Sequence, residues 1–274
     1  MSTIHYPSTE QRTSTGRGSI KELLLPIFVQ VGTAAESLRA DSLGIVAHGA
    51  DRYLLPRFVF RGHASSEPML KLAIFAGIHG DEPAGILACI DFLRVLEAQP
   101  HLGRGYEIRV YPLCNPTGYE DGTRESRSGC DLNRAFWKTT AEPEVRLLEE
   151  ELRTQHFDGI VSLHSDDTSD GVYAFIGGAT LTEHLLKPAL AAAEQALPIN
   201  GSTVIDGFHA IEGIIRSGYG GMLTAPPGSH PAPFEIVLES PSGAPVALQR
   251  QALVLALTEI VRHHRRLISY AANI

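Results

Sequence analysis

The segment from Leu70 to Glu82 constrains the fold more than any other part of the chain. An apolar run, Leu70–Ala76, predicts a buried strand, and the two glycines that follow permit a tight turn. A helical stripe of apolar residues then covers Glu82–Leu96. His79 therefore follows the carboxyl end of a strand, and Glu82 opens the next helix. Both side chains can converge in the crevice where open α/β sheets bind ligands, so we interpret them as a pair of metal ligands.

Strands and helices alternate along the rest of the chain. Further strands are predicted at Gly44–His48, Tyr53–Arg61, Glu107–Tyr111, Gly159–Leu163 and Phe234–Glu239, and further helices at Glu142–Thr154, Leu181–Ala196 and Pro245–Ser269. This order predicts an α/β fold in one domain, with a mixed, mostly parallel twisted sheet and helices on both faces. Residues 1–40 form a separate N-terminal segment in this interpretation, partly disordered, and 41–274 form the domain. Residues 197–232 are rich in Gly and Pro and are expected to form long loops bordering a site.

Composition excludes several classes of partner. The hydrophobic content of 43% over 274 residues suffices for one core. The net charge of −8 and the lack of a Lys/Arg block argue against nucleic acid as a partner. No stretch has the length and hydrophobicity of a signal peptide or a membrane span, so we expect a cytoplasmic protein without membrane contact. Three cysteines, Cys89, Cys114 and Cys130, are expected to be free thiols. The sequence does not indicate an oligomeric state.

A third metal ligand is needed, and His164 is the best candidate. It ends the strand-like run Asp158–His164 and so repeats the placement of His79. The alternative is an ordinary core or surface histidine. Two histidines and one glutamate leave an open fourth position for water, which is typical of catalytic zinc. A second His-x-x-Glu, His209 to Glu212, lies in an extended segment, where positions i and i+3 face opposite sides, so we do not expect it to bind metal.

Several motifs, taken in order, resemble the zinc carboxypeptidases. They are Gly-x-His-Gly-Asp-Glu ending at Glu82, Asn-Pro-x-Gly at Asn115, Asp-Leu-Asn-Arg-x-Phe at Asp131, the strand-end His164, and Leu-Glu-x-Pro around Glu239. The resemblance runs from about Leu43 to the end of the chain. It lies near the murein-peptide amidases and the succinylglutamate desuccinylase/aspartoacylase group. It implies that residues 41–274 are a catalytic domain.

The resemblance implies a role for each matching residue. One zinc ion would be held by His79, Glu82 and His164, and Glu239 would be the general base for a zinc-activated water. Glu235, four positions earlier on the same face of the strand, competes for that role. We place Asp166 and Asp167 as hydrogen-bond partners of the ligands, the alternative being attraction of a cationic substrate group.

The resemblance also implies a substrate-binding set. Asn133 and Arg134 would clamp a substrate carboxylate, the alternative for Arg134 being an ion pair with Asp131. Arg124 is our first choice for stabilising the oxyanion, with Arg127 as its rival. Tyr219, in a glycine-flanked loop, would cover the substrate, although an ordinary loop tyrosine fits as well.

These expectations lead to three hypotheses of function. The first is a zinc metallocarboxypeptidase, a hydrolase acting in proteolysis, which cleaves a peptide or amide bond next to a free carboxylate. The second is an N-acyl amino acid deacylase like aspartoacylase or succinylglutamate desuccinylase, so that the partner is a small peptide or an acyl-amino acid. The deacylase group carries a β-rich segment after the catalytic glutamate, whereas 35 residues follow Glu239 here, mostly one helix. The third hypothesis is a metal-free binding protein on the same scaffold.

Overall fold

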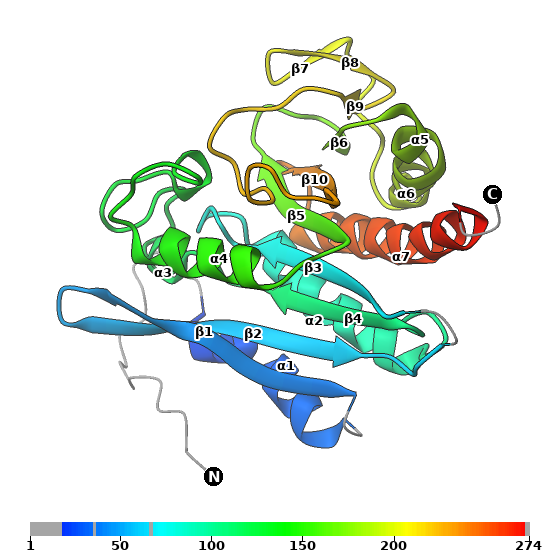
Figure 1. The fold of residues 1–274 in the computed structure, drawn as a ribbon. Helices are drawn as coiled ribbons and strands as arrows, with labels where there is room; N and C mark the ends of the chain where they lie inside the picture. The colour runs from blue at the N-terminus through cyan, green and yellow to red at the C-terminus, as the bar shows by residue number, and fades with distance from the viewer. Residues whose placement is uncertain (1–17, 35–36, 66–67, 272–274) are drawn as a thin grey trace.

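The computed structural model describes residues 18–34, 37–65 and 68–271. It contains one mixed sheet (Figure 1). Its strands lie in the order β1-β2-β4-β3-β5-β10-β6-β9-β8-β7. Their bounds are β1 (Leu38–His48), β2 (Asp51–Arg61), β3 (Leu70–Ala76), β4 (Tyr106–Tyr111), β5 (Gly159–Asp166), β6 (Tyr173–Ile176), β7 (Val204–Ile205), β8 (Phe208–Ile211), β9 (Ile214–Ile215) and β10 (Phe234–Pro241).

Parallel pairing is concentrated at the centre of the sheet. Strands β4, β3, β5 and β10 pair in parallel, in that order. On one side β2 and β1 continue the sheet antiparallel, and on the other side β10 pairs antiparallel with β6. The predicted mixed sheet is confirmed, but "mostly parallel" describes its centre rather than the whole. Short turns join β1 to β2 and β7 to β8 to β9, and a short turn permits only antiparallel pairing.

Helices cover both faces of the sheet, as predicted, and the alternating side chains of β4 show how. Arg109 and Tyr111 point toward α4 and donate hydrogen bonds to Glu151 at 3.0 and 2.6 Å. Tyr106 points to the opposite face, where its hydroxyl lies 3.0 Å from Nδ1 of His264 in α7. Figure 1 accordingly shows α4 on one side of the sheet and α2 with α7 on the other.

The helical segments agree with most of the predicted ranges. They are α1 (Ile20–Thr33), α2 (Pro83–Ala98), α3 (Pro116–Asp121), a 3₁₀ turn (Leu132–Arg134), α4 (Pro143–Thr154), α5 (Ala179–Leu181), a π turn (Thr182–Leu186), α6 (Lys187–Ala193) and α7 (Val246–Ala271). Helix α7 packs against α2 and α6, and one large apolar cluster joins these helices to the sheet. Among the helices of the described ranges, none has the length and apolar character needed to cross a bilayer.

Helix α1 was not predicted from the sequence. It begins with a capping box, in which Ser19 accepts a hydrogen bond from the backbone of Glu22 while the Glu22 carboxylate accepts one from the Ser19 backbone. Ile20, Leu24 and Ile27 are buried in the main core, which attaches this helix to the domain. Partial disorder was predicted for residues 1–40, of which 1–17 and 35–36 lie outside the described residues.

Residues 197–232 are less irregular than predicted. Three short strands, β7, β8 and β9, lie within this stretch and extend the sheet beyond β6. The predicted loops at Gly218–Gly221 and Ala225–Pro231 contain no helix or strand. The first of these loops carries Tyr219, which borders the same cavity as Glu239 of β10, where the candidate site lies.

Candidate active site

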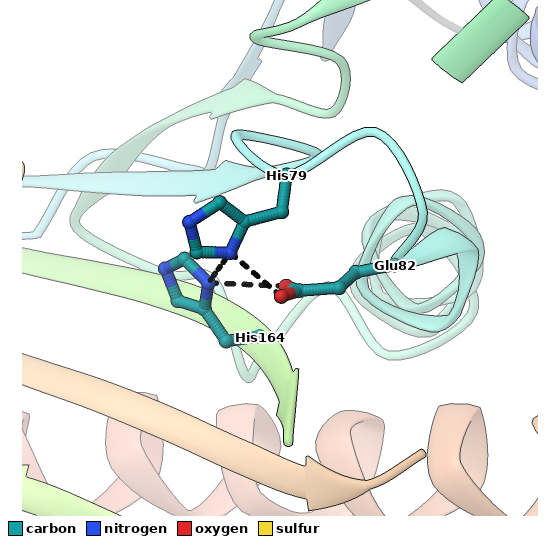
Figure 2. Close-up of side chains that lie close together, drawn as sticks. All are labelled: His79, Glu82 and His164. Carbon is teal, nitrogen blue, oxygen red and sulfur yellow. Dashed lines mark hydrogen bonds and ion pairs between the residues drawn. The ribbon is translucent and has the colours of Figure 1, made fainter. Parts of the chain in front are cut away.

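Three potential metal-binding side chains converge on one point beside the carboxyl ends of β3 and β5. The Nδ1 atom of His79 lies 2.6 Å from Oε1 of Glu82, and Nδ1 of His164 lies 3.1 Å from Oε2 of Glu82 and 3.2 Å from Nδ1 of His79. All three residues are buried, and their facing atoms lie within 4.8 Å of one another. Figure 2 shows both imidazole rings and the carboxylate pointing toward this common centre.

The local sequence explains why these side chains meet. Gly77 turns the chain after β3 with a φ of 61°, a conformation that side-chain-bearing residues rarely adopt. A Cβ at Gly80 would lie 1.9 Å from the backbone of Gly118, so this turn also requires glycine. Glu82 directly precedes α2, and Pro83 is well suited to the first helical position. His164 lies near the end of β5, the neighbour of β3 in the sheet.

The donor set fits a divalent cation such as zinc. Burial opposes ionisation of Glu82, yet the neighbouring His164 and His79 lower its pKa to about 2, so the group is a carboxylate. Burial lowers the pKa of His164, which favours its neutral, metal-binding form. One cation could accept the lone pairs of all three ligand atoms, which face one another inside the protein. Two histidines with one glutamate are a known zinc ligand set.

Asp131 contacts His79 on the side of the ring that faces away from the metal-binding group. Its Oδ1 lies 3.2 Å from Nε2 of His79 and accepts a second bond from the backbone N–H of Asn133 at 2.9 Å. Such a carboxylate orients a metal-binding imidazole and increases its basicity. The sequence interpretation assigned this supporting role to Asp166 and Asp167 instead. In the structure Asp166 accepts hydrogen bonds from Thr168 and Tyr173, so that assignment was wrong for Asp166.

The structure separates the two candidate arginines. Arg124 borders the cavity at the metal-binding group, 3.2 Å from Asp131 and 3.7 Å from Glu82. Arg127 points away and forms ion pairs with Asp51 and Asp121 at 3.0 and 2.7 Å. Arg124 is therefore the arginine placed to reach a substrate. Asp131 pairs with Arg124, and within the described residues no ion pair joins it to Arg134.

Asn133, Arg134 and Tyr219 lie together at the cavity wall. The Asn133 Oδ1 atom accepts a hydrogen bond from the backbone N–H of Leu223 at 2.9 Å. The Arg134 guanidinium stacks over the Tyr219 ring at 4.4 Å and forms no ion pair with any described carboxylate. The Tyr219 hydroxyl donates to the backbone carbonyl of Asp206 at 2.7 Å. An arginine without a carboxylate partner, facing a cavity, is free to bind an anion.

Glu239 is the carboxylate that faces the metal-binding group from β10. Its backbone is in register with His164 on β5, and its side chain borders the same cavity. Burial and the nearby carboxylates of Glu82 and Asp166 raise its pKa well above the usual range. Glu235, its rival, borders a different cavity and accepts a hydrogen bond from the Ala225 backbone at 2.5 Å. Glu239 is therefore the better-placed candidate for a base.

These residues share one cavity of about 410 Å³. Its wall includes every residue of the sequence-derived site except His164, which is buried beside Glu82. Two arginines and six carboxylates border it, namely Arg124, Arg134, Asp81, Glu82, Asp166, Asp167, Asp206 and Glu239.

The remaining sequence expectations concern residues outside this cavity. His209 and Glu212 are exposed, and Glu212 lies 3.5 Å from Nζ of Lys187, apart from the three-residue group. The three cysteines are free thiols, as predicted.

A family comparison agrees with the geometry. The family model of the succinylglutamate desuccinylase/aspartoacylase catalytic domain matches residues 68–203. This range contains His79, Glu82 and His164 together with Arg124 and the loop around Asp131, and it ends before Glu239. A search among curated proteins found no match to this chain.

Several solved structures share this fold. An inferred metallopeptidase from Shewanella amazonensis has a TM-score of 0.75 at 24% identity, over 89% of this chain and 92% of that one. A second, from Shewanella denitrificans, has a TM-score of 0.73 at 24% identity, over 89% and 90%. A metallo-carboxypeptidase from Burkholderia cenocepacia has a TM-score of 0.69 at 16% identity, over 92% and 70%. At these identities the likeness establishes the fold.

The fold, the buried donor group and the family match point to a metal-dependent hydrolase. More particularly, the chain resembles the zinc carboxypeptidases near the succinylglutamate desuccinylase/aspartoacylase group, which confirms the resemblance carried by the sequence motifs.

Proposed function

We propose that this protein is a zinc-dependent metallocarboxypeptidase that hydrolyses a peptide or amide bond next to a free carboxylate. The observation that supports this most is the pairing of two features in one cavity. The metal-binding group lies at one part of the wall, and the Arg134 guanidinium, which forms no ion pair with a described carboxylate, lies at another. A hydrolase that acts beside a carboxylate requires both features.

His79, Glu82 and His164 would hold the ion. When bound, the ion supplies Lewis-acid chemistry, which polarises a carbonyl group and makes water more acidic. Each remaining role in the reaction falls to a side chain at the cavity wall.

Arg134 binds the substrate carboxylate through its planar fork of N–H donors, and Asn133 adds a neutral donor. Tyr219 covers the bound substrate. Arg124 donates hydrogen bonds to the oxygen on which negative charge develops, and Asp131 fixes its guanidinium. Glu239 takes a proton from the attacking water and passes it to the leaving amine.

The second candidate is an N-acyl amino acid deacylase, which the family match supports. Succinylglutamate and acylated aspartate each carry more than one carboxylate. Of the two arginines that border the cavity, only Arg134 lacks a carboxylate partner among the described residues. Carboxylates outnumber arginines in the cavity wall. Like charges at a binding surface disfavour a ligand. This charge balance favours a substrate with one carboxylate, and therefore the peptidase.

Hydrolysis of a substrate panel tests the proposal. The panel contains short peptides with varied C-terminal residues, the same peptides amidated at the C-terminus, and acetyl- and succinyl-amino acids. We expect hydrolysis of the free-carboxylate peptides, loss of this activity on chelation, and recovery with added zinc. Faster cleavage of the acyl-amino acids would assign the deacylase function instead. Activity toward none of the substrates, with no bound metal, would support a metal-free binding protein.

A further inference from the structure

We propose that Gln249 of α7 is a positioning residue that holds His164 of the metal-binding group and the base Glu239 at a fixed separation. Gln249 does not border the catalytic cavity, and it acts through two serines at the ends of β5 and β10. This inference rests on the proposed carboxypeptidase function.

The strands that carry His164 and Glu239 need support at this end. The two residues are aligned partners on β5 and β10. Ser165 and Ser240, the next residues on each strand, are also partners, and the alternation of side chains turns them toward the opposite face. One further pair follows, and it contains Pro241, which has no N–H to donate to the ladder. Backbone pairing therefore holds this end of the two strands less firmly than their middle.

Gln249 links the two strand ends from the side of α7. Its Oε1 atom lies 3.0 Å from the Ser165 hydroxyl and 3.1 Å from the Ser240 hydroxyl, and each hydroxyl can donate to it. The Ser240 hydroxyl also lies 3.2 Å from the backbone carbonyl oxygen of His164. One amide oxygen thus joins the residue after His164 to the residue after Glu239.

The amide nitrogen of Gln249 holds the turn that follows β10. It donates to the backbone carbonyls of Ser242 and Ala244 at 3.3 and 2.7 Å. The backbone N–H of Ser242 donates in turn to the carbonyl of Asp166, at the end of β5, at 2.8 Å. Because carbonyl oxygens only accept hydrogen bonds, the amide has one orientation in which all of these contacts form.

Burial makes this link rigid. Gln249 is 3% exposed and Ser240 is buried. A buried polar side chain costs free energy unless it is hydrogen-bonded, and a fully bonded network rigidifies the groups that it joins. Among the described residues, no side chain donates a hydrogen bond to the Glu239 carboxylate, so its position depends on the backbone of β10. Loosening this strand end would therefore displace Glu239 relative to His164.

Zinc affinity and peptide hydrolysis of Gln249→Met test the inference. Methionine is also long and unbranched, but it lacks the amide. We expect zinc affinity, measured by competition with a chelating dye, to fall by roughly 3- to 10-fold, less than when a direct partner of a metal-binding imidazole is lost. At saturating zinc, kcat should fall by about 10- to 100-fold, the effect of misplacing a catalytic group by about 1 Å, with KM unchanged.

Two further variants separate positioning from stability. Leu257→Ala creates a cavity in the core two helical turns, about 12 Å, further along α7, and should lower the melting temperature. At a temperature where it is folded, this control should keep the zinc affinity and kcat of the wild-type protein. Ser240→Ala should weaken zinc binding as Gln249→Met does, and the double variant should be no weaker, because both changes remove the same contacts.

Unchanged zinc affinity and kcat in Gln249→Met, with a lower melting temperature, would overturn the inference by showing a role in stability alone. Equal losses in Leu257→Ala, or fully additive losses in the double variant, would also overturn it. If Gln249→Met does not fold, unchanged zinc affinity and kcat in Ser240→Ala would do so.

The same measurements distinguish this inference from the proposed function. Peptide hydrolysis by the wild-type protein, with full kcat and zinc affinity in both Gln249→Met and Ser240→Ala, would uphold the peptidase and reject the positioning role. Weaker zinc binding by these variants, without hydrolysis of any peptide by the wild-type protein, would uphold the link to His164 and reject the peptidase.

Discussion

Replacing Asp131 by asparagine should weaken metal binding although Asp131 is not itself a ligand. The carboxylate accepts hydrogen bonds from His79 and from the backbone of Asn133 through one oxygen, and from Arg124 through the other. Asparagine preserves the shape of the side chain but offers one acceptor oxygen. If that oxygen stays with His79 and Asn133, the amide NH₂ faces the Arg124 guanidinium, which is also a donor.

The magnitude of the effect follows from this geometry. Loss of a carboxylate that supports a metal-binding histidine typically costs 10- to 100-fold in metal affinity. Because the neutral oxygen keeps its bond to His79 in Asp131→Asn, we expect the lower end of this range, about tenfold, or ~1.4 kcal/mol. The freed Arg124 should also lose its fixed position, so the turnover number should fall further than metal occupancy alone explains.

The assay is competition for zinc against a chelating dye of known affinity, followed by peptide hydrolysis at saturating zinc. Asp121→Asn is the matched control, because Asp121 pairs with Arg127 away from the cavity. We expect this control to bind zinc as the wild-type protein does. An unchanged zinc affinity in Asp131→Asn would refute the idea that Asp131 orients His79.

Three further predictions concern the base, the clamp and a buried histidine. Glu239→Gln should lower kcat by about 10²- to 10⁴-fold, the usual contribution of a general base, with zinc content by mass spectrometry unchanged; simultaneous loss of the metal would argue for a structural role. Arg134→Ala should reduce kcat/KM for peptides with a free carboxylate far more than for amidated analogues, and equal losses would count against the clamp. Burial lowers the pKa of His264 to about 4. Below pH 6.5 the His264 imidazole therefore takes up a proton more readily in the unfolded chain than in the folded protein, and the free energy of unfolding falls as the pH drops from 6.5 toward 4. Urea unfolding across this range should show a loss of up to about 3 kcal/mol that His264→Gln removes, whereas the same pH dependence in both proteins would contradict it.

The sequence predicted the strand-to-helix unit at the site because its signals are local. An apolar run, a glycine turn and a helix start follow one another between Leu70 and Glu82, and each has its own physical signature. His164 could be added because a second strand ended in the same way. Parallel neighbouring strands bring their carboxyl ends together, so local placement sufficed to predict that these residues meet.

The direction of strand pairing and the contacts between residues far apart in the sequence could not be predicted in the same way. Whether Arg124 or Arg127 faces the cavity depends on Asp51 and Asp121, which lie on two separate elements and form ion pairs with Arg127. The contact of Asp131 with His79 joins residues 52 positions apart. Such contacts depend on how loops fold over the sheet, and one sequence carries no local signal for them.

Helix α1 is a different case, since its signal was present. Ser19 and Glu22 form the spacing of a capping box, directly before the apolar residues that the helix buries. The polar residues before Ser19 and the proline at position 26 are both unfavourable signs for a helix, and they argued against predicting one here. Proline within a helix removes one backbone hydrogen bond, and the burial of Leu24 and Ile27 in the core offsets that loss here.

The most direct test of the account is the metal content of the purified protein. Inductively coupled plasma mass spectrometry should find one zinc per chain in the wild-type protein. It should find none in the double variant His79→Ala/His164→Ala, while His209→Ala, which removes an exposed histidine, should retain the metal. A wild-type protein that binds no divalent metal when zinc is supplied, or a double variant that keeps its full complement, would contradict the assignment of His79, Glu82 and His164 as a metal centre.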